Sequence, residues 1–178
     1  FEASFVATAG MARDFDHFDD FGWWALAMVR GAMLLKSSAA KRRDYLFTAA
    51  TVFEMYVDRA WDTRQCGGGV FWGPLDQPAY KNAITNELFL ALGGALHDAT
   101  RDAKYLEWTS RQWRWLESSG MINVHGLFND GLTAVTCRNN GQTTWTYNQG
   151  VVLGGLASLY RATGNESLLR VAHRTANA

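Results

Sequence analysis

The stretch YKNAITNELFLALGGALHDATRDAKYLEWTSRQWRWLE, residues 80–117, decides the fold class. Its first part, residues 80–100, is apolar on nearly every side and contains the small pair Gly93-Gly94, which is typical of a helix buried on both sides. Its second part, residues 103–117, is amphipathic and leaves Arg111 and Arg114 available to water. Because the connection between the two parts is short, we predict a helical hairpin with one inner and one outer helix.

The same arrangement recurs on both sides of this stretch. Residues 21–36 pair with 43–61, and residues 146–163 pair with 166–178, so an inner helix begins about every 60–66 residues. Inner apolar helices that alternate with outer amphipathic helices are the pattern of an α/α toroid built from stacked hairpins. We therefore predict an all-α protein, an (α/α)6 toroid or barrel, present here as an incomplete piece of about three helical hairpins. Residues 1–178 are expected to be part of a single domain truncated at both ends.

The composition excludes several classes of function. The chain of 178 residues has 17 basic and 17 acidic side chains and a formal net charge of +0, so nucleic acid is not an expected partner. No run of about 18 apolar residues occurs, so no transmembrane segment is predicted. We see no Cys/His spacing that suits zinc, and we predict no metal and no cofactor. The protein is expected to be a monomer.

Cys66 and Cys137, the two cysteines, lie in segments rich in Gly and Asn. A disulfide between them would close a loop of roughly 70 residues and contribute about 4 kcal/mol, but two free thiols fit the sequence equally well. Asn165 begins an Asn-Glu-Ser glycosylation sequon, which matters only for a secreted protein.

If the inner helices run in the same direction, their first turns share one rim, and the long segments that precede them arrive there too. This rim collects carboxylates, amides and aromatic rings, the groups from which carbohydrate sites are built. The substrate-binding candidates are Trp72, Tyr80, Asn82, Asn86, Asp130, Trp145, Tyr147, Asn148 and Gln149. Core packing explains the aromatic residues about equally well, helix capping explains the amides, and a turn at Asp-Gly explains Asp130. Of Trp23 and Trp24, which are consecutive, we expect at most one to face the site while the other packs.

Asp19 and Asp20 are adjacent carboxylates at the start of the first inner helix. Cleavage of a glycosidic bond needs two carboxyl groups, which are about 5–5.5 Å apart in retaining enzymes. Adjacent side chains at a helix start can reach such a spacing, and their repulsion raises one pKa. The alternative is that the pair only caps the helix and complements its dipole.

Five motifs in order resemble glycoside hydrolase family 76, the endo-α-1,6-mannanases and their fungal cell-wall relatives. They are FDDFGWWALA, WDTRQCGGGVFW, YKNAITNELF, NDGL and WTYNQGVVLGGLASLYRATGN. The resemblance implies an (α/α)6 barrel and a retaining mechanism on α-1,6-linked mannose. It makes Asp19 the nucleophile and Asp20 the general acid/base. It also implies α-1,6-mannan or a mannooligosaccharide as the partner, and a secreted or cell-wall location.

Three other functions fit parts of this pattern. A cell-wall transglycosylase would use the same two aspartates with a second glycan in place of water. A non-catalytic mannan-binding protein would be expected to have lost one carboxylate of the pair, but both are present here. A terpene cyclase is disfavoured because the acidic pair continues as DDFGW and not as DDxxD.

Overall fold

The computed structural model describes residues 17–35, 37–73 and 80–178. In these ranges the chain forms six α-helices and one π-helical turn. They are α2 (Phe18–Leu34), α3 (Ala39–Met55), η1 (Tyr56–Ala60), α4 (Ala83–Thr100), α5 (Ala103–Ser118), α6 (Thr146–Thr163) and α7 (Glu166–Ala176). β-Pairing in the same ranges is confined to isolated bridges, such as Ile122 with Phe128 in the long segment before α6. The all-α prediction is confirmed.

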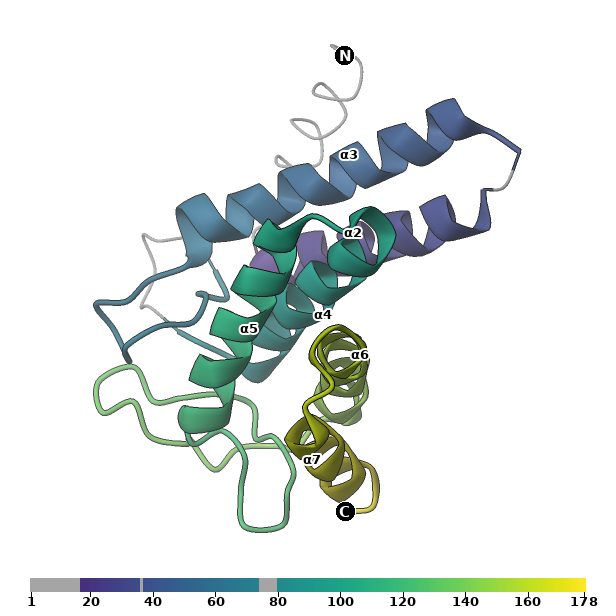
Figure 1. The fold of residues 1–178 in the computed structure, drawn as a ribbon. Coiled ribbons are helices and arrows are strands. Elements are labelled where there is room, and N and C mark those ends of the chain that lie inside the picture. The colour runs from purple at the N-terminus through teal and green to yellow at the C-terminus, as the bar shows by residue number, and fades with distance from the viewer. Residues whose placement is uncertain (1–16, 36, 74–79) are drawn as a thin grey trace.

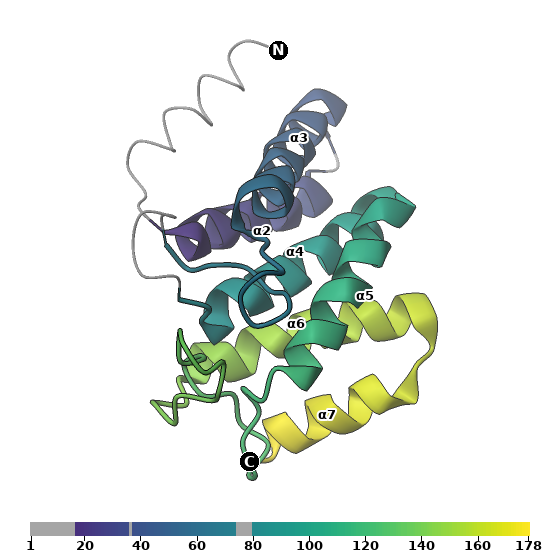
Figure 2. The same cartoon turned by 90° about the vertical axis from the view of Figure 1, so that its left-hand side faces the viewer.

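The helices form three hairpins, α2–α3, α4–α5 and α6–α7 (Figure 1). Helix α4 lies between α2 and α6 and packs against both, whereas α3, α5 and α7 each cover the inner helix of their own hairpin (Figure 2). This is the predicted division into inner and outer layers, and it makes the chain part of an (α/α)6 arrangement.

Of the three inner helices that the structure describes, only α4 is buried on all sides. Every residue of α4 from Ala83 to Leu96 is buried, because α2 and α6 cover its two sides and α5 covers its back. Helix α2 buries one side and leaves the other open, so that Trp23 and Trp24 are 41% and 47% exposed. The prediction that one of the two tryptophans packs is wrong within the described part of the chain, since the helices that contact α2 there lie on its opposite side.

The tight turns between paired helices follow from local chemistry. Asp102 caps α5 by accepting a hydrogen bond from Lys104 N at 3.0 Å, and Asn165 caps α7 by accepting one from Ser167 N at 3.0 Å. Just before these caps, Arg101 and Gly164 adopt left-handed backbone conformations that end α4 and α6.

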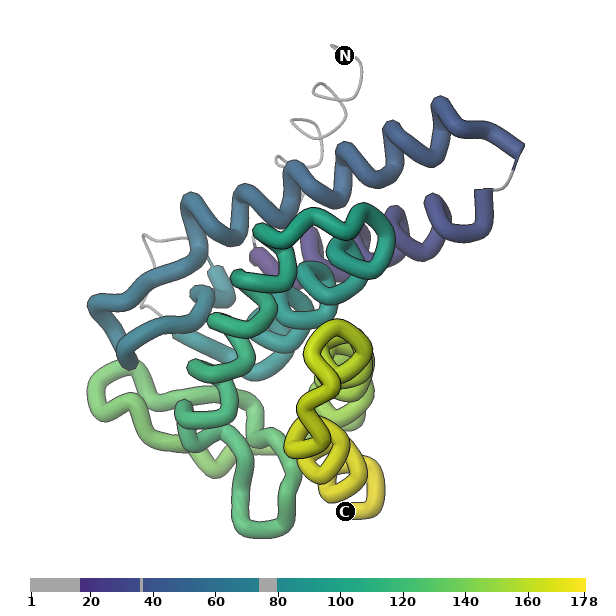
Figure 3. Tube along the Cα trace, viewed as in Figure 1, coloured from purple at the N-terminus to yellow at the C-terminus, as the bar shows by residue number. Residues whose placement is uncertain are grey.

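The described part of the segment between η1 and α4 meets the segment between α5 and α6 at one end of the molecule (Figure 3). A disulfide between Cys66 and Cys137, with Cα atoms 5.3 Å apart, joins them, so the open question about these cysteines is answered in favour of the bond. The buried Lys81 holds the first segment in shape, because its Nζ donates to the carbonyl oxygens of Asp62, Gln65 and Gly68 at 2.6–2.7 Å.

Candidate active site

The inner helices α2, α4 and α6 begin at the same end of the molecule, where the two long segments also gather (Figure 2). We call this end the rim. It contains the described parts of residues 61–82 and 119–145 together with the first turns of the three inner helices. The predicted site residues all lie at or just beneath it.

Asp19 and Asp20 lie in the first turn of α2. The N-cap position is His17, whose side chain makes no capping hydrogen bond. Asp19 Oδ1 instead accepts a hydrogen bond from Trp72 Nε1 at 3.0 Å, and the Asp20 carboxylate has no hydrogen bond or ion pair among the described residues. Helix capping therefore does not account for the pair.

Trp72 joins the loop before α4 to the start of α2. Besides its bond to Asp19, its backbone oxygen accepts from Phe18 N at 2.8 Å, and its backbone N–H donates to Tyr80 O at 2.8 Å. The His17 ring stacks on the indole with 4.0 Å between ring centroids, and Tyr80 meets the indole edge-on. Trp72 was predicted to offer a flat surface to a sugar, but His17 occupies one of its faces.

The environment of Asp19 changes the protonation of its carboxyl group. Partial burial raises the pKa of Asp19, and the neighbouring charge of Asp20 raises it further. The Asp19 backbone N–H, the Trp72 indole and His17 act in the opposite direction because they stabilise the ionised form, yet the pKa remains raised. The raised pKa therefore falls on Asp19, to which the resemblance assigns the role of nucleophile.

Two residues that the sequence analysis missed hold the start of α2 in place. Tyr56 in η1 is fully buried, and its hydroxyl donates to Phe18 O at 2.6 Å. Gly22 allows this close approach, since a Cβ atom there would lie 2.5 Å from Tyr56 Oη and 2.9 Å from Leu88 Cβ. The only signal in the sequence was a glycine within an apolar helix, directly after FDDF.

A third carboxylate at the rim, Asp130, lies in a network of its own. Trp145 Nε1 donates to Asp130 Oδ1 at 3.0 Å, and the Tyr80 hydroxyl donates to Oδ2. Asn140 Nδ2 in turn donates to Tyr80 Oη at 2.9 Å. Burial and the Asp130 carboxylate raise the pKa of Tyr80, so its hydroxyl stays protonated and able to donate.

Trp145 and Tyr147, two of the aromatic candidates for sugar binding, form an exposed surface at the rim. Their rings are stacked, with centroids 5.8 Å apart and an angle of 9° between planes, and they are 45% and 42% exposed. Burial raises the pKa of Tyr147, and the negative charges of Asp130 and Asp19 raise it further.

The four predicted amides lie beneath the rim, and three of them hold the fold together through hydrogen bonds. Asn82 caps α4, and the fully buried Asn86 binds both the N–H and the carbonyl of Val70. The side-chain amide of Gln149 accepts a hydrogen bond from Phe128 N and donates one to Phe128 O. Asn148 is buried, and its amide has no hydrogen-bond partner among the described residues.

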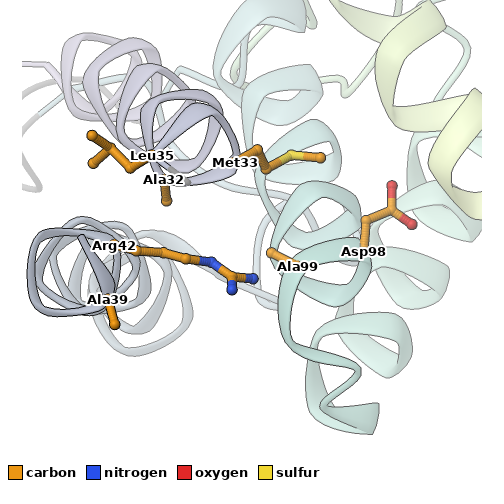
Figure 4. Close-up of a pocket in the computed structure, with 7 residues that line it drawn as sticks. All are labelled: Ala32, Met33, Leu35, Ala39, Arg42, Asp98 and Ala99. Carbon is orange, nitrogen blue, oxygen red and sulfur yellow. The ribbon is translucent and has the colours of Figure 1, made fainter. Parts of the chain in front are cut away.

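Described residues line several hollows at the opposite end of the inner helices. One, of about 460 Å³, is lined mainly by small or apolar residues of α2, α3 and α4, with Arg42 and Asp98 (Figure 4). Figure 4 shows Arg42 reaching between the helices, while the Asp98 carboxylate points away from it. That carboxylate is bound by Ser158 and Arg161 instead. Because its two charged groups do not converge, this hollow offers no catalytic arrangement.

Among the residues that the structure describes, neither a candidate metal site nor a membrane-spanning helix occurs. No three His, Cys, Asp or Glu side chains come together there as a metal site. None of the helices has the length and apolar character needed to cross a membrane.

Comparison with known proteins identifies the family of this chain. The model of glycosyl hydrolase family 76 matches residues 6–178. Mannan endo-1,6-alpha-mannosidase DFG5 of Saccharomyces cerevisiae is 32% identical over 153 residues, which cover 82% of this chain and 33% of that protein. The chain spans about a third of the length of the curated relatives that it matches.

Solved structures agree with this assignment. The GH76A alpha-1,6-mannanase from Salegentibacter sp. HEL1_6 superimposes with a TM-score of 0.79 at 26% identity, covering 92% of this chain and 46% of that one. An inactive variant of that enzyme, in which two consecutive aspartates are replaced by asparagine, was solved with alpha-1,6-mannotriose. It has a TM-score of 0.76 at 24% identity and covers the same shares of the two chains. The family match over nearly the whole chain, together with the inner and outer helical layers, shows that the protein belongs to glycosyl hydrolase family 76.

Proposed function

We propose that the full-length protein is a retaining glycosidase that cleaves α-1,6-mannosidic linkages of mannan, with Asp19 as nucleophile and Asp20 as general acid/base. The observation that carries this proposal is the position and the hydrogen bonding of the two carboxylates. They are adjacent in the first turn of α2 and neither caps the helix. One is oriented by the Trp72 indole, and the other makes no hydrogen bond among the described residues.

The name of the related enzyme supports the choice of residues and substrate. The Salegentibacter protein is named an alpha-1,6-mannanase, and a variant that lacks two consecutive aspartates is described as inactive. Asp19-Asp20 is the only pair of consecutive aspartates in this chain.

Each residue has a role in the proposed reaction. Asp19 attacks the anomeric carbon of a mannose unit while Asp20 protonates the departing glycosidic oxygen, which forms a covalent mannosyl-enzyme. Asp20 then takes a proton from water, and that water releases the sugar. The Trp72 N–H stabilises the ionised Asp19 that the first step requires. Trp145 and Tyr147 offer a stacking surface, and Asp130, held by Trp145 and Tyr80, lies where it can accept from a mannose hydroxyl.

The disulfide fits an oxidising compartment. Mannan is a polymer of cell walls, so we place the protein outside the cell membrane or at the wall.

The test is turnover of α-1,6-mannan by the full-length protein and by Asp19→Asn and Asp20→Asn. We expect each change to lower turnover by about 10³-fold or more while the fold and mannan binding persist. Asn is as good a helix former at the first turn as Asp, so a structural role predicts nearly normal activity in both variants. Near-normal turnover in both would contradict the proposal.

The fate of the intermediate is tested in the same assay. Product analysis with and without an added mannooligosaccharide separates hydrolysis, which yields free reducing ends, from transfer to the acceptor. Hydrolysis is expected, and transfer that dominates at low acceptor concentration would make the protein a transglycosylase.

A further inference from the structure

His17 lies directly before α2, and none of the steps above uses it. It occupies the N-cap position with an extended backbone (φ −129°, ψ 144°), yet its side chain makes no capping hydrogen bond. Ser, Thr, Asp and Asn are the residues that cap a helix well, and histidine is not among them. The position of the imidazole ring therefore needs another explanation.

The start of α2 is held by Trp72 instead. The Trp72 carbonyl oxygen accepts from Phe18 N at 2.8 Å, so it satisfies one of the N–H groups that a helix leaves unpaired at its beginning. The Trp72 side chain reaches the same turn and donates from Nε1 to Asp19 Oδ1 at 3.0 Å. One residue therefore fixes both the helix start and the carboxylate to which we assign the nucleophile.

The imidazole ring of His17 packs on a face of this indole. The ring centroids are 4.0 Å apart, and the planes are inclined by 24°. Tyr80 contacts the indole at right angles, with 6.2 Å between centroids and 89° between planes. Gly73 leaves room for the histidine, since a Cβ atom there would lie 3.2 Å from His17 Cδ2. With its backbone bonded on both sides and a ring on its face, the indole has little freedom to turn.

The hydrogen bond to Asp19 depends on the orientation of the indole. Hydrogen bonds weaken steeply as they depart from a linear geometry, and tryptophan has only one side-chain donor. A rotation of the indole would therefore take the donor away from Asp19, and the side chain has no other to replace it. We propose that His17 is a positioning residue, which stacks on Trp72 and thereby holds the indole N–H against Asp19. The effect on turnover rests on the proposed function, whereas the control of the indole by His17 does not.

The charge of a protonated His17 is a separate contribution. It lowers the pKa of Asp19, as the indole hydrogen bond also does, because both favour the ionised carboxylate. The other titratable groups that act on Asp19 within the described ranges are Asp20 in the same turn, Tyr56 of η1 and Tyr147 of α6. The pKa of each tyrosine is raised, so both hydroxyls stay neutral while Asp19 titrates. A test of the stack must therefore hold the charge at residue 17 constant.

The first test compares His17→Ala with His17→Phe in the full-length protein. Neither replacement carries a charge, so the difference between the two variants measures the stacked ring alone. His17→Ala should have a kcat on an α-1,6-mannooligosaccharide about tenfold lower than His17→Phe, the size expected for the loss of a ring pair. Its acid limb should also lie at higher pH, because Asp19 is left with a weaker hydrogen bond. A kcat or an acid limb that is the same in the two variants would overturn the proposal.

The second test asks whether His17 acts through Trp72. In a Trp72→Phe background no indole N–H remains to be oriented, so His17→Ala and His17→Phe should have equal kcat values and equal acid limbs. A Trp145→Phe background, which lacks the indole bonded to Asp130, is the matched control, and there the difference should persist. A difference that persists in Trp72→Phe would contradict the proposal, because His17 would then act on the site by another route.

The third test follows the indole itself and needs no turnover. In protein labelled with 5-fluorotryptophan, the fluorine resonance of Trp72 is the one that is absent in Trp72→Phe. We expect one sharp resonance in the wild type and in His17→Phe, and a broadened or split resonance in His17→Ala, where the indole samples several orientations. The resonance of Trp145, assigned in the same way, should be unchanged in all three proteins and shows that the fold persists.

A single sharp Trp72 resonance in His17→Ala would overturn the proposal. This measurement remains valid even if the protein turns over no mannan, so the inference about His17 and the proposed function fail separately.

Discussion

The rim contains two carboxylates that are held in the same way and yet differ in what remains free. Asp19 and Asp130 each accept an indole N–H at 3.0 Å, from Trp72 and from Trp145 respectively. Asp130 also binds the Tyr80 hydroxyl, so both its oxygens are engaged. Asp19 is bonded to another side chain through one oxygen only and has the Asp20 carboxylate beside it.

This difference separates orientation from reactivity. A carboxylate with both oxygens bound is a fixed acceptor that can hold a ligand hydroxyl. A carboxylate oriented through one oxygen, with a second carboxyl group beside it, has the arrangement that a double displacement at an anomeric carbon requires. We therefore expect equivalent substitutions at the two places to give different kinetic results.

The largest difference in kinetics is expected when the negative charge of each carboxylate is removed. Asp19→Asn should lower kcat by about 10³-fold or more, because the nucleophile is lost. Asp130→Asn should lower kcat/KM by about tenfold, chiefly through KM, because only one charge-assisted hydrogen bond weakens. Steady-state kinetics on an α-1,6-mannooligosaccharide measures both, and equal losses of kcat would remove the distinction.

Removing each of the two indole donors should give a smaller difference in turnover, and this difference should depend on pH. Trp72→Phe removes a hydrogen bond that lowers the pKa of Asp19, so that pKa should rise further and turnover should fall by about a hundredfold. The ionised nucleophile is lost as pH falls through this pKa, so the acid limb of the kcat profile should move to higher pH. Trp145→Phe is the matched control and should leave that limb unmoved. A shift of the limb in Trp145→Phe alone would contradict the assignment.

The smallest effect concerns how α2 is seated. Gly22→Ala should destabilise the protein by about 1–3 kcal/mol, because its Cβ would overlap Tyr56 Oη and Leu88. Gly154→Ala, in α6 with open space around it, is the control and should be neutral or stabilising by up to about 1 kcal/mol. Denaturant unfolding of the two variants checks this, and a neutral Gly22→Ala would show that α2 can move away from η1.

Periodicity in the sequence was enough to predict the helices and their layers. Residues 80–117 show why, since the change from an all-round apolar pattern to an amphipathic one marks the change from inner to outer helix. The position of Asp19 and Asp20 at the rim followed from the shared direction of the inner helices. The disulfide stayed open because its formation depends on how two loops fold, and loops have no such period.

The contacts beneath the rim could not be predicted from the sequence. Tyr56 reaches Phe18 from 38 residues away because η1 turns it under α2, and no local pattern encodes that contact. The predicted amides were assigned to the site because their type suits a sugar, yet Asn86 and Gln149 are used by the backbone of distant loops.

The central claim is that Asp19 forms the covalent bond to mannose, and trapping that bond tests it most directly. A mannose-configured epoxide is opened by the nucleophile and leaves a stable ester, so peptide mass spectrometry after treatment of the full-length protein identifies the modified residue. We predict a single ester on Asp19, its absence in Asp19→Asn, and protection by an α-1,6-mannooligosaccharide. An ester on Asp20 or on a residue outside the pair would contradict the account.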